Sequence, residues 1–214
     1  MNTPMRQRLL EAASELFYAQ GLRAVSADKI IDRVGTTKVT FYRHFRTKDD
    51  LVVAYLQLRA QQERDGIDGA LAQAGNDTDL ALRLISEGYA GVACTPGFRG
   101  CPFINAAAEY PDEDSEVRRV VGEHRAWFHG MFLKVISPLG LAEPDAVAEQ
   151  LMLLRDGALV AGYLTDPAKV GPSLYNGWRA WWPTPAPERL RTLPQGAATS
   201  AFLIMSSLCD PSRR

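Results

Sequence analysis

Apolar residues recur at helical spacing along most of the chain, and glycines, prolines and polar capping residues separate the apolar runs. The first run predicts a helix that ends near Gly21, and its apolar face consists of Leu9, Ala13, Leu16 and Phe17. The second run predicts a short helix between an N-cap at Ser26 and an end at Gly35. Its apolar face consists of Ala27, Ile30, Ile31 and Val34.

A third short helix is predicted after a turn of very few residues. Thr37 is placed to cap it, and the run from Lys38 to Phe45 forms it. Two short helices joined by a tight turn that contains glycine are typical of the helix-turn-helix arrangement. Thr47 then predicts the start of a longer helix over about 48–74, because the acidic residues Asp49 and Asp50 suit its positive N-terminal end.

The next hundred residues carry more helical patterns and no strand pattern strong enough to assign. They predict helices over about 80–93, 103–109, 112–137 and 143–164, so the expected fold class is all-α. The helix over 143–164 is apolar on two sides, one of which carries Leu153, Val160 and Leu164. We interpret it as packed between its own core and a partner subunit. A central helix in a monomer is the alternative.

Composition changes after residue 165. Seven prolines fall within residues 166–214, together with Trp178, Trp181 and Trp182. A long helix cannot pass through 183–187, where three of five residues are proline, although 197–209 could form a short apolar helix. Two hypotheses stay open for this atypical segment. It is either the product of a shifted reading frame or a genuine extension whose tryptophans cover apolar surface.

Charge is unevenly distributed along the chain, although the net charge is only −1. Residues 1–60 carry ten basic and six acidic side chains, a balance of +4, and the remainder carries 14 and 19, a balance of −5. The basic N-terminal region, residues 1–60, suits contact with a polyanion. Chance segregation of charge is the alternative interpretation. Because no run of about 18 apolar residues and no secretory leader is present, we expect a cytoplasmic protein.

These features together resemble the TetR family of bacterial transcriptional regulators. The resemblance covers nearly all of residues 6–56 and rests on the block Phe41-Tyr42-Arg43-His44-Phe45, the preceding Gly35 turn and the helix start Thr47-Lys48-Asp49-Asp50-Leu51. A second stretch, Gly100–Glu109, is similar to a segment in one branch of the family. The resemblance implies a DNA-binding domain over 1–50 and a helical regulatory and dimerisation domain over 51–165. It also implies a homodimer, most simply a repressor, that a small-molecule effector releases from a palindromic operator in double-stranded DNA.

The third predicted helix carries the residues expected to read DNA. Phe41 and Phe45 can pack on the helices behind it, which leaves an opposite face for contact with a major groove. Base edges are within reach of Lys38, Val39 and Thr40, and many family members have glycine at the position of Val39. Tyr42, His44 and Lys48 match family positions that hold phosphate. The full predicted DNA-binding set is Ser26, Lys29, Thr37, Lys38, Val39, Thr40, Tyr42, Arg43, His44 and Lys48.

The effector contacts are predicted less sharply, because aromatic residues and methionines at helical spacing also build ordinary cores. Charged residues within apolar runs, such as Arg155, need a partner if they are buried. The predicted effector-binding set is Tyr89, Phe98, Phe103, Asn105, Glu109, Trp127, Phe128, Met131, Met152, Arg155 and Tyr163.

The sequence contains no enzyme motif and no metal-binding motif. The chain lacks a nucleophile elbow, a phosphate loop and paired carboxylates, and His124 and His129 are spaced to diverge on a helix. We therefore expect no catalytic residues, no metal and no cofactor. A thiol-based redox sensor that uses Cys94 and Cys101 is one alternative, since Arg99 lies nearby in the sequence. A helical protein that has lost DNA binding is the other.

Overall fold

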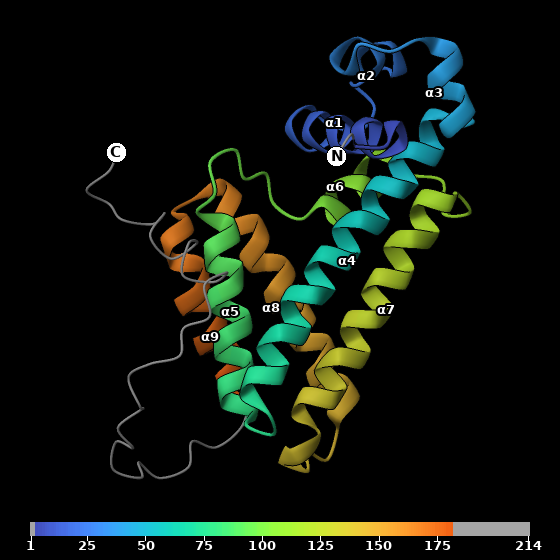
Figure 1. The fold of residues 1–214 in the computed structure, drawn as a ribbon. Coiled ribbons are helices and arrows are strands. Elements are labelled where there is room, and N and C mark those ends of the chain that lie inside the picture. The colour runs from blue at the N-terminus through green and yellow to red at the C-terminus, as the bar shows by residue number, and fades with distance from the viewer. Residues whose placement is uncertain (1–2, 182–214) are drawn as a thin grey trace. The chain divides into compact units, whose positions relative to one another are not determined.

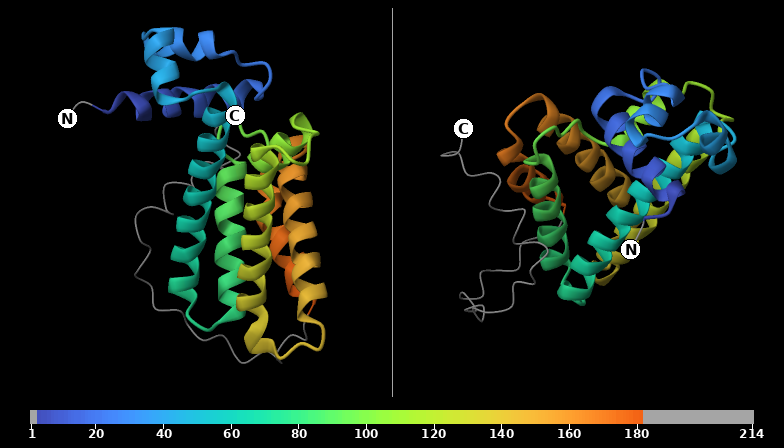
Figure 2. Two further views of the ribbon diagram at one scale, coloured as in Figure 1. Left: turned by 90° about the vertical axis from the view of Figure 1, so that its right-hand side faces the viewer. Right: turned by 45° about the horizontal axis from the view of Figure 1, so that its top comes forward.

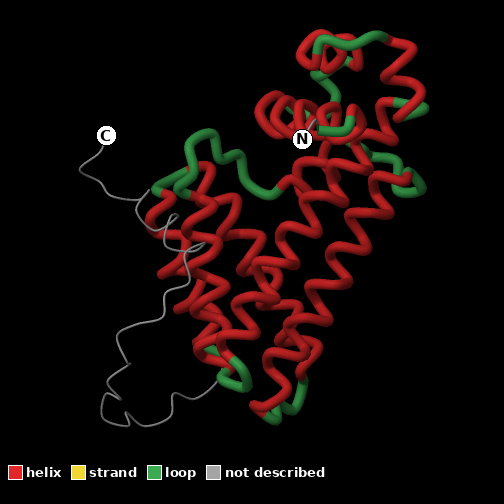
Figure 3. Tube along the Cα trace, viewed as in Figure 1, coloured by secondary structure: helices red, strands yellow, loops and turns green. Residues whose placement is uncertain are grey.

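The computed structural model describes residues 3–181, and every regular element within that range is a helix (Figure 3). The order of elements is labelled in Figure 1. They are α1 (Met5–Gln20), α2 (Ala27–Val34), α3 (Lys38–His44), α4 (Lys48–Ala74), α5 (Thr78–Ala93), α6 (Pro102–Glu109), α7 (Glu116–Ile136), the short 3₁₀ turn η1 (Ser137–Leu139), α8 (Pro144–Leu164), η2 (Pro167–Lys169) and α9 (Val170–Arg179). The prediction of an all-α fold is confirmed for the described residues.

The first three helices form a small head whose local structure follows from the capping residues. The Ser26 side chain accepts the Lys29 N–H at the start of α2, and the Thr37 side chain accepts the Thr40 N–H at the start of α3. Gly35 ends α2 in the left-handed conformation, with φ of +69°, which permits the tight turn into α3. Figure 2 shows these helices gathered at the N-terminal end of α4. The predicted helix-turn-helix is confirmed.

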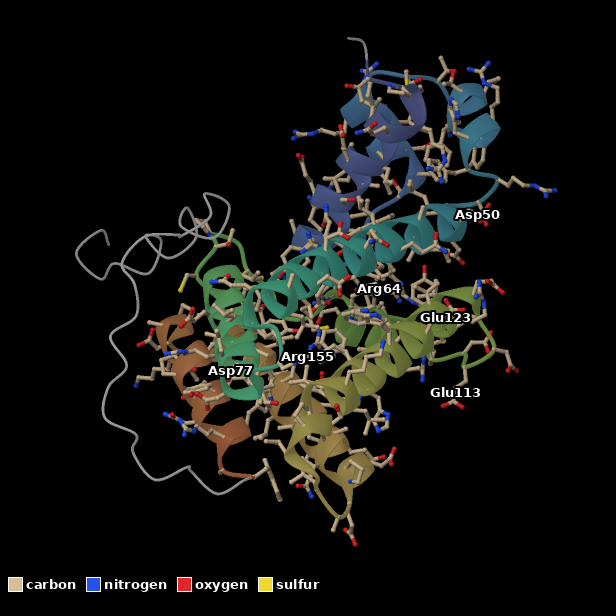
Figure 4. The ribbon with its side chains drawn as sticks, turned by 60° about the horizontal axis from the view of Figure 1, so that its bottom comes forward. Asp50, Arg64, Asp77, Glu113, Glu123 and Arg155 are labelled. Atoms are coloured by element: carbon tan, nitrogen blue, oxygen red, sulfur yellow. The ribbon has the colours of Figure 1, made fainter. Side chains whose placement is uncertain are left out.

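The start of α4 is a reciprocal capping arrangement. The Asp50 N–H donates to Thr47 Oγ1 at 3.0 Å, and the Thr47 N–H donates to Asp50 Oδ2 at 3.0 Å. Figure 4 labels Asp50 at this end of the helix. The direction in which α4 leaves the head is therefore held by bonds between residues that are three apart in sequence.

The chain divides into two compact units that each combine separate stretches of sequence. The first unit contains residues 1–65 and 101–127, so it holds the head together with α6 and the first parts of α4 and α7. The second unit contains residues 66–100 and the chain from Phe128 onward, and its described part includes α5, α8 and α9. No helix among the described residues is long and apolar enough to cross a membrane.

In the second unit, α9 packs against α5 and α8, and it lies where sequence analysis assigns no helix (Figure 1). Pro172 is tolerated because it occupies the first turn, where a backbone N–H has no partner within the helix. Trp178 is fully buried and donates its indole N–H to the Leu151 carbonyl at 2.9 Å. The atypical segment thus begins with a packed helix, and the part predicted around 183–187 and 197–209 lies outside the described residues.

Two glycines permit the close approach of these helices. A Cβ at Gly171 would lie 2.8 Å from Ala90 Cβ, and one at Gly162 would lie 2.8 Å from Val170 Cγ2. Distances below 3 Å exclude a larger side chain unless the helices separate. The absence of a side chain at Gly162 therefore permits the close approach of α8 and the start of α9.

Candidate nucleic-acid interface and regulatory core

Helix α3 has one buried and one exposed face. Phe41 and, just beyond the helix, Phe45 are buried, as are Ile30, Ile31 and Phe17 in the helices behind them. The opposite face exposes Val39, which is 79% accessible to solvent, and Arg43. Tyr42 on this face is half exposed. Val39 therefore contributes nothing to the core of the head and stays accessible on this face of α3.

Lys38 is paired with an acidic residue that sequence analysis missed. Its Nζ lies 2.9 Å from Asp28 Oδ1 and 3.0 Å from Oδ2, and both side chains are largely exposed. The hydrogen bond and the charge of Asp28 raise the pKa of Lys38 above its ordinary value. The signal in the sequence was an acid at the start of α2, which is also a normal residue for the first turn of a helix.

Two other lysines that are predicted to contact DNA also make bonds within the head. The Lys29 Nζ donates to Gln20 Oε1 beside the Ser26 cap. The Lys48 Nζ donates to the carbonyls of Leu22 at 3.0 Å and Val25 at 3.2 Å. Lys48 therefore stabilises the loop between α1 and α2, while its predicted contact with phosphate stays a prediction.

Two predicted effector contacts meet at Arg155 in the second unit. Arg155 is buried and donates from Nε to Tyr89 Oη at 2.8 Å and from Nη1 to Asp156 Oδ1 at 2.9 Å. Its guanidinium carbon also lies 4.2 Å from the centre of the Phe128 ring. Figure 4 labels Arg155 among the helices of this unit. The expectation that a buried charge here needs a partner is met within the same chain.

The first unit holds a second aromatic cluster, centred on His124. Its ring stacks on Phe103 with 3.5 Å between centroids, and Nε2 lies 3.1 Å from Glu63 Oε2. Arg64, labelled on α4 in Figure 4, lies over the Trp127 ring at 5.2 Å. Sequence analysis includes Phe103 and Trp127 among the effector contacts but misses Glu63 and His124. The available signal was a charged pair, Glu63-Arg64, inside a long helix.

The remaining predicted effector contacts are placed differently from one another. Met131 and Met152 are buried, Phe98 and Asn105 are partly buried, and Tyr163 is half exposed. The predicted contact Glu109 is bonded to the head through both carboxylate oxygens, which accept from Leu22 N and Arg23 N. Some members of the predicted set thus gather in an Arg155 cluster and a His124 cluster, while Glu109 joins α6 to the head.

The cysteines bear on the redox alternative. Cys101, directly before α6, is buried and forms no disulfide with Cys94 in this structure. Burial also limits the access of an oxidant to Cys101. The third cysteine, Cys209, lies outside the described residues. Among residues 3–181, no group of histidine, cysteine, aspartate and glutamate side chains is arranged to hold a metal ion.

Comparison with known proteins adds independent observations. Residues 9–55 match the family model described as bacterial regulatory proteins of the tetR family. The crystal structure of SCO4454, a TetR-family transcriptional regulator from Streptomyces coelicolor, is 37% identical, with a TM-score of 0.78 over 82% of this chain and 92% of that one. A putative TetR transcriptional regulator from Streptomyces avermitilis is 27% identical, with a TM-score of 0.68 over 82% and 96% of the two chains.

A curated relative matches over a shorter stretch. The HTH-type transcriptional activator FasR of Mycolicibacterium smegmatis is 37% identical over 84 residues, which are 39% of this chain and 38% of FasR. The match therefore spans well under half of that relative, whereas the likeness to the solved Streptomyces structures extends over both units.

Proposed function

Because the chain belongs to the TetR family of bacterial transcriptional regulators, we propose that it is a homodimeric repressor that a small-molecule effector releases from a near-palindromic operator. Proteins of this family bind DNA and usually act as dimers with small-molecule effectors. The chain is accordingly a DNA-binding regulator and not an enzyme. Its place of action is then the cytoplasm, where bacterial DNA lies.

The observation that carries the proposal is the exposed face of α3. A helix that enters a major groove with its N-terminal end presents its first residues to base edges. In α3 these are Lys38, Val39 and Thr40, held on a core of buried aromatic side chains. Val39 suits the methyl group of thymine, and Lys38 and Thr40 can form hydrogen bonds with base edges.

Around these residues, the proposed phosphate contacts supply most of the affinity and little of the sequence choice. They are Ser26 and Lys29 on the α2 side and Tyr42, Arg43, His44 and Lys48 on the α3 and α4 side. Ser26 and Thr37 cap α2 and α3, which fixes where the two helices begin on this face of the head.

The proposed dimer contact lies on α8. Leu153, Val160 and Leu164 recur seven and four residues apart on this helix, and they are 66%, 43% and 68% exposed in the single chain. Apolar side chains in a continuous stripe indicate a surface that a partner covers. In such a dimer the two heads would bind two half-sites on compatible faces of DNA.

The effector is proposed to act in the regulatory part of the chain. The Arg155 and His124 clusters are the strongest candidates for contact, because each combines a buried ionisable side chain with aromatic rings. An effector releases DNA only if it binds the DNA-incompetent state more tightly than the competent one.

The proposal is tested by selecting DNA from a random pool with the purified protein and footprinting the selected sequence. We expect two-fold symmetric protection and an affinity that falls steeply with salt. Transcription from a promoter that carries the selected site should fall in the presence of the protein. A rise in transcription would instead indicate an activator, which is how FasR is described. Failure to select any DNA at low salt would contradict the proposal.

Arg43→Ala should weaken operator binding about tenfold and reduce the slope of log affinity against log salt by about one, because it removes one exposed cation from the DNA face. Gel-shift titrations at several salt concentrations measure both quantities. Lys134→Ala removes an equally exposed cation from the second unit and should leave both unchanged. Equal effects of the two variants would show that only net charge matters.

Asp28→Asn should raise the affinity for scrambled DNA about threefold, because it removes a negative charge that lies beside Lys38 on the proposed DNA face. Affinity for the selected operator should rise less, so discrimination between the two DNAs falls. Titration of both DNAs at one salt concentration measures this ratio. Glu11→Gln, an exposed acid on α1, serves as the control. An unchanged ratio for Asp28→Asn would exclude a role of Asp28 in sequence choice.

A further inference from the structure

The loop between α1 and α2 is hydrogen-bonded from two sides. On one side, Glu109 at the end of α6 accepts the Leu22 N–H at 2.9 Å with Oε1 and the Arg23 N–H at 2.7 Å with Oε2. On the other side, Lys48 at the start of α4 donates to the carbonyls of Leu22 and Val25. Two helices that come from distant parts of the sequence therefore hold the same few residues of backbone.

The local geometry suits a carboxylate at position 109. Its two oxygens match two successive amide donors, and hydrogen bonds to a charged acceptor are stronger than neutral ones. Gly21 precedes the donors with φ of +93°, and a Cβ there would lie 3.2 Å from Glu109 Oε1. Glycine at this position thus avoids both backbone strain and a tight contact with the carboxylate.

Further contacts tie the end of α6 to the same place. The Arg23 Nε donates to the Glu109 carbonyl at 2.5 Å, and its guanidinium lies over the Tyr110 ring. The Tyr110 hydroxyl donates to Asp49 Oδ1 at 2.7 Å, next to Lys48 on α4. Burial, with the bond to Asp49 as a second cause, raises the pKa of Tyr110 above its ordinary value.

The loop transmits its position to the DNA-reading helix through packed side chains. Leu22 and Val25 are buried in the head, and Ser26 caps α2 directly after them. Ile30 and Ile31 of α2 are buried like Phe41 of α3. Because a closely packed core does not deform gradually, a shift of the loop moves α2 and α3 with it.

We propose that Glu109 is a positioning residue that couples the orientation of the DNA-reading head to α6. This inference rests on the proposed function, because orientation matters when two heads of a dimer must meet two half-sites. Each added base pair moves the half-sites apart by about 3.4 Å and rotates one relative to the other. A firmly held head tolerates such a change poorly, whereas a loosely held head adapts to it.

The test measures how affinity depends on half-site spacing. Operator DNA selected by the wild-type protein is prepared with its native spacer and with one or two added base pairs. Wild-type affinity should fall about tenfold or more with the added pairs. Glu109→Gln loses one of the two hydrogen bonds and the charge that strengthens the other, so its affinity should fall about threefold or less. Glu113→Gln is the matched control. Glu113 is exposed, and its Oε1 forms a long ion pair, 3.8 Å from Arg118 Nη2.

Hydrogen exchange supplies a second measurement that needs no DNA. In Glu109→Gln the amides of Leu22 and Arg23 and those of α2 should exchange faster, while those of the first part of α7 keep their protection. Should Glu109→Gln fail to fold, Glu109→Asp keeps the charge on a side chain one methylene shorter and should change the spacing ratio in the same direction.

Two outcomes would overturn the inference alone. The first is a Glu109→Gln protein whose affinity falls with the added base pairs as much as that of the wild type. The second is an equal loss of affinity at every spacing together with uniformly faster exchange, which is the result expected of a merely structural residue. A wild-type protein that selects no DNA would overturn the proposed function and this inference with it.

Discussion

Replacing Leu164 with glutamate should leave the protomer folded but convert the protein into a monomer that binds its operator about 100-fold more weakly. The Leu164 side chain is exposed in the single chain, at one end of the apolar stripe on α8. Since it makes little contact with its own core, the substitution costs the protomer little, whereas an unpaired carboxylate in an apolar interface is strongly unfavourable. Separation of the two heads then removes the gain from simultaneous binding to two half-sites, which is commonly about 100-fold or more.

Sedimentation velocity measures the oligomeric state, and titration with the selected operator measures the affinity. Val92→Glu is the matched control, because Val92 is an exposed apolar residue on α5 and not on the α8 stripe. It should remain dimeric and bind like the wild type. A Leu164→Glu protein that stays dimeric would place the dimer contact elsewhere on the chain.

Replacing Trp178 with alanine should lower the free energy of unfolding by about 3–5 kcal/mol, a typical loss for a fully buried aromatic residue. Trp178 packs edge-on against Phe132 with 5.4 Å between ring centroids, and its indole N–H donates a hydrogen bond to the Leu151 carbonyl. The substitution therefore leaves a cavity and removes a hydrogen bond in the second unit. Urea titration followed by circular dichroism measures the change.

Two variants separate the contributions of the ring and of the indole N–H. Trp178→Phe keeps an aromatic ring but no donor, so it should cost about 1–3 kcal/mol. Trp181→Ala removes a tryptophan that is 43% exposed and should change the free energy of unfolding by less than about 1 kcal/mol. Similar losses at positions 178 and 181 would contradict the packing of α9.

The head was predictable from sequence because its structure depends on short-range rules. Ser26, Thr37 and Thr47 each bond to a backbone N–H three residues later, and Gly35 ends α2 in the conformation that glycine favours. The apolar face of each helix could likewise be read from its spacing. The candidate DNA-reading residues followed from the same pattern, since the side opposite a buried Phe41 has to be exposed.

Contacts in the regulatory part of the chain were less predictable, because the residues that form each contact are far apart in sequence. The sequence indicates that Arg155 needs a partner if buried, but its bond to Tyr89 spans 66 residues and no local rule selects that hydroxyl. In the head, the sequence does not single out Asp28 as a partner of Lys38, because an acid in the first turn of a helix already has a local explanation. In α9, prolines and tryptophans masked a helix that exists because Trp178 is buried against α8.

The amino-acid sequence by itself determined the helices of the head, their caps and the residues that α3 exposes, because these depend on contacts within a few turns of chain. Only the tertiary structure decided that Glu109 bonds to Leu22, 87 residues away, and that Lys48 binds the same loop from the other side. A carboxylate can accept any nearby N–H, so its partner is chosen by how the helices pack.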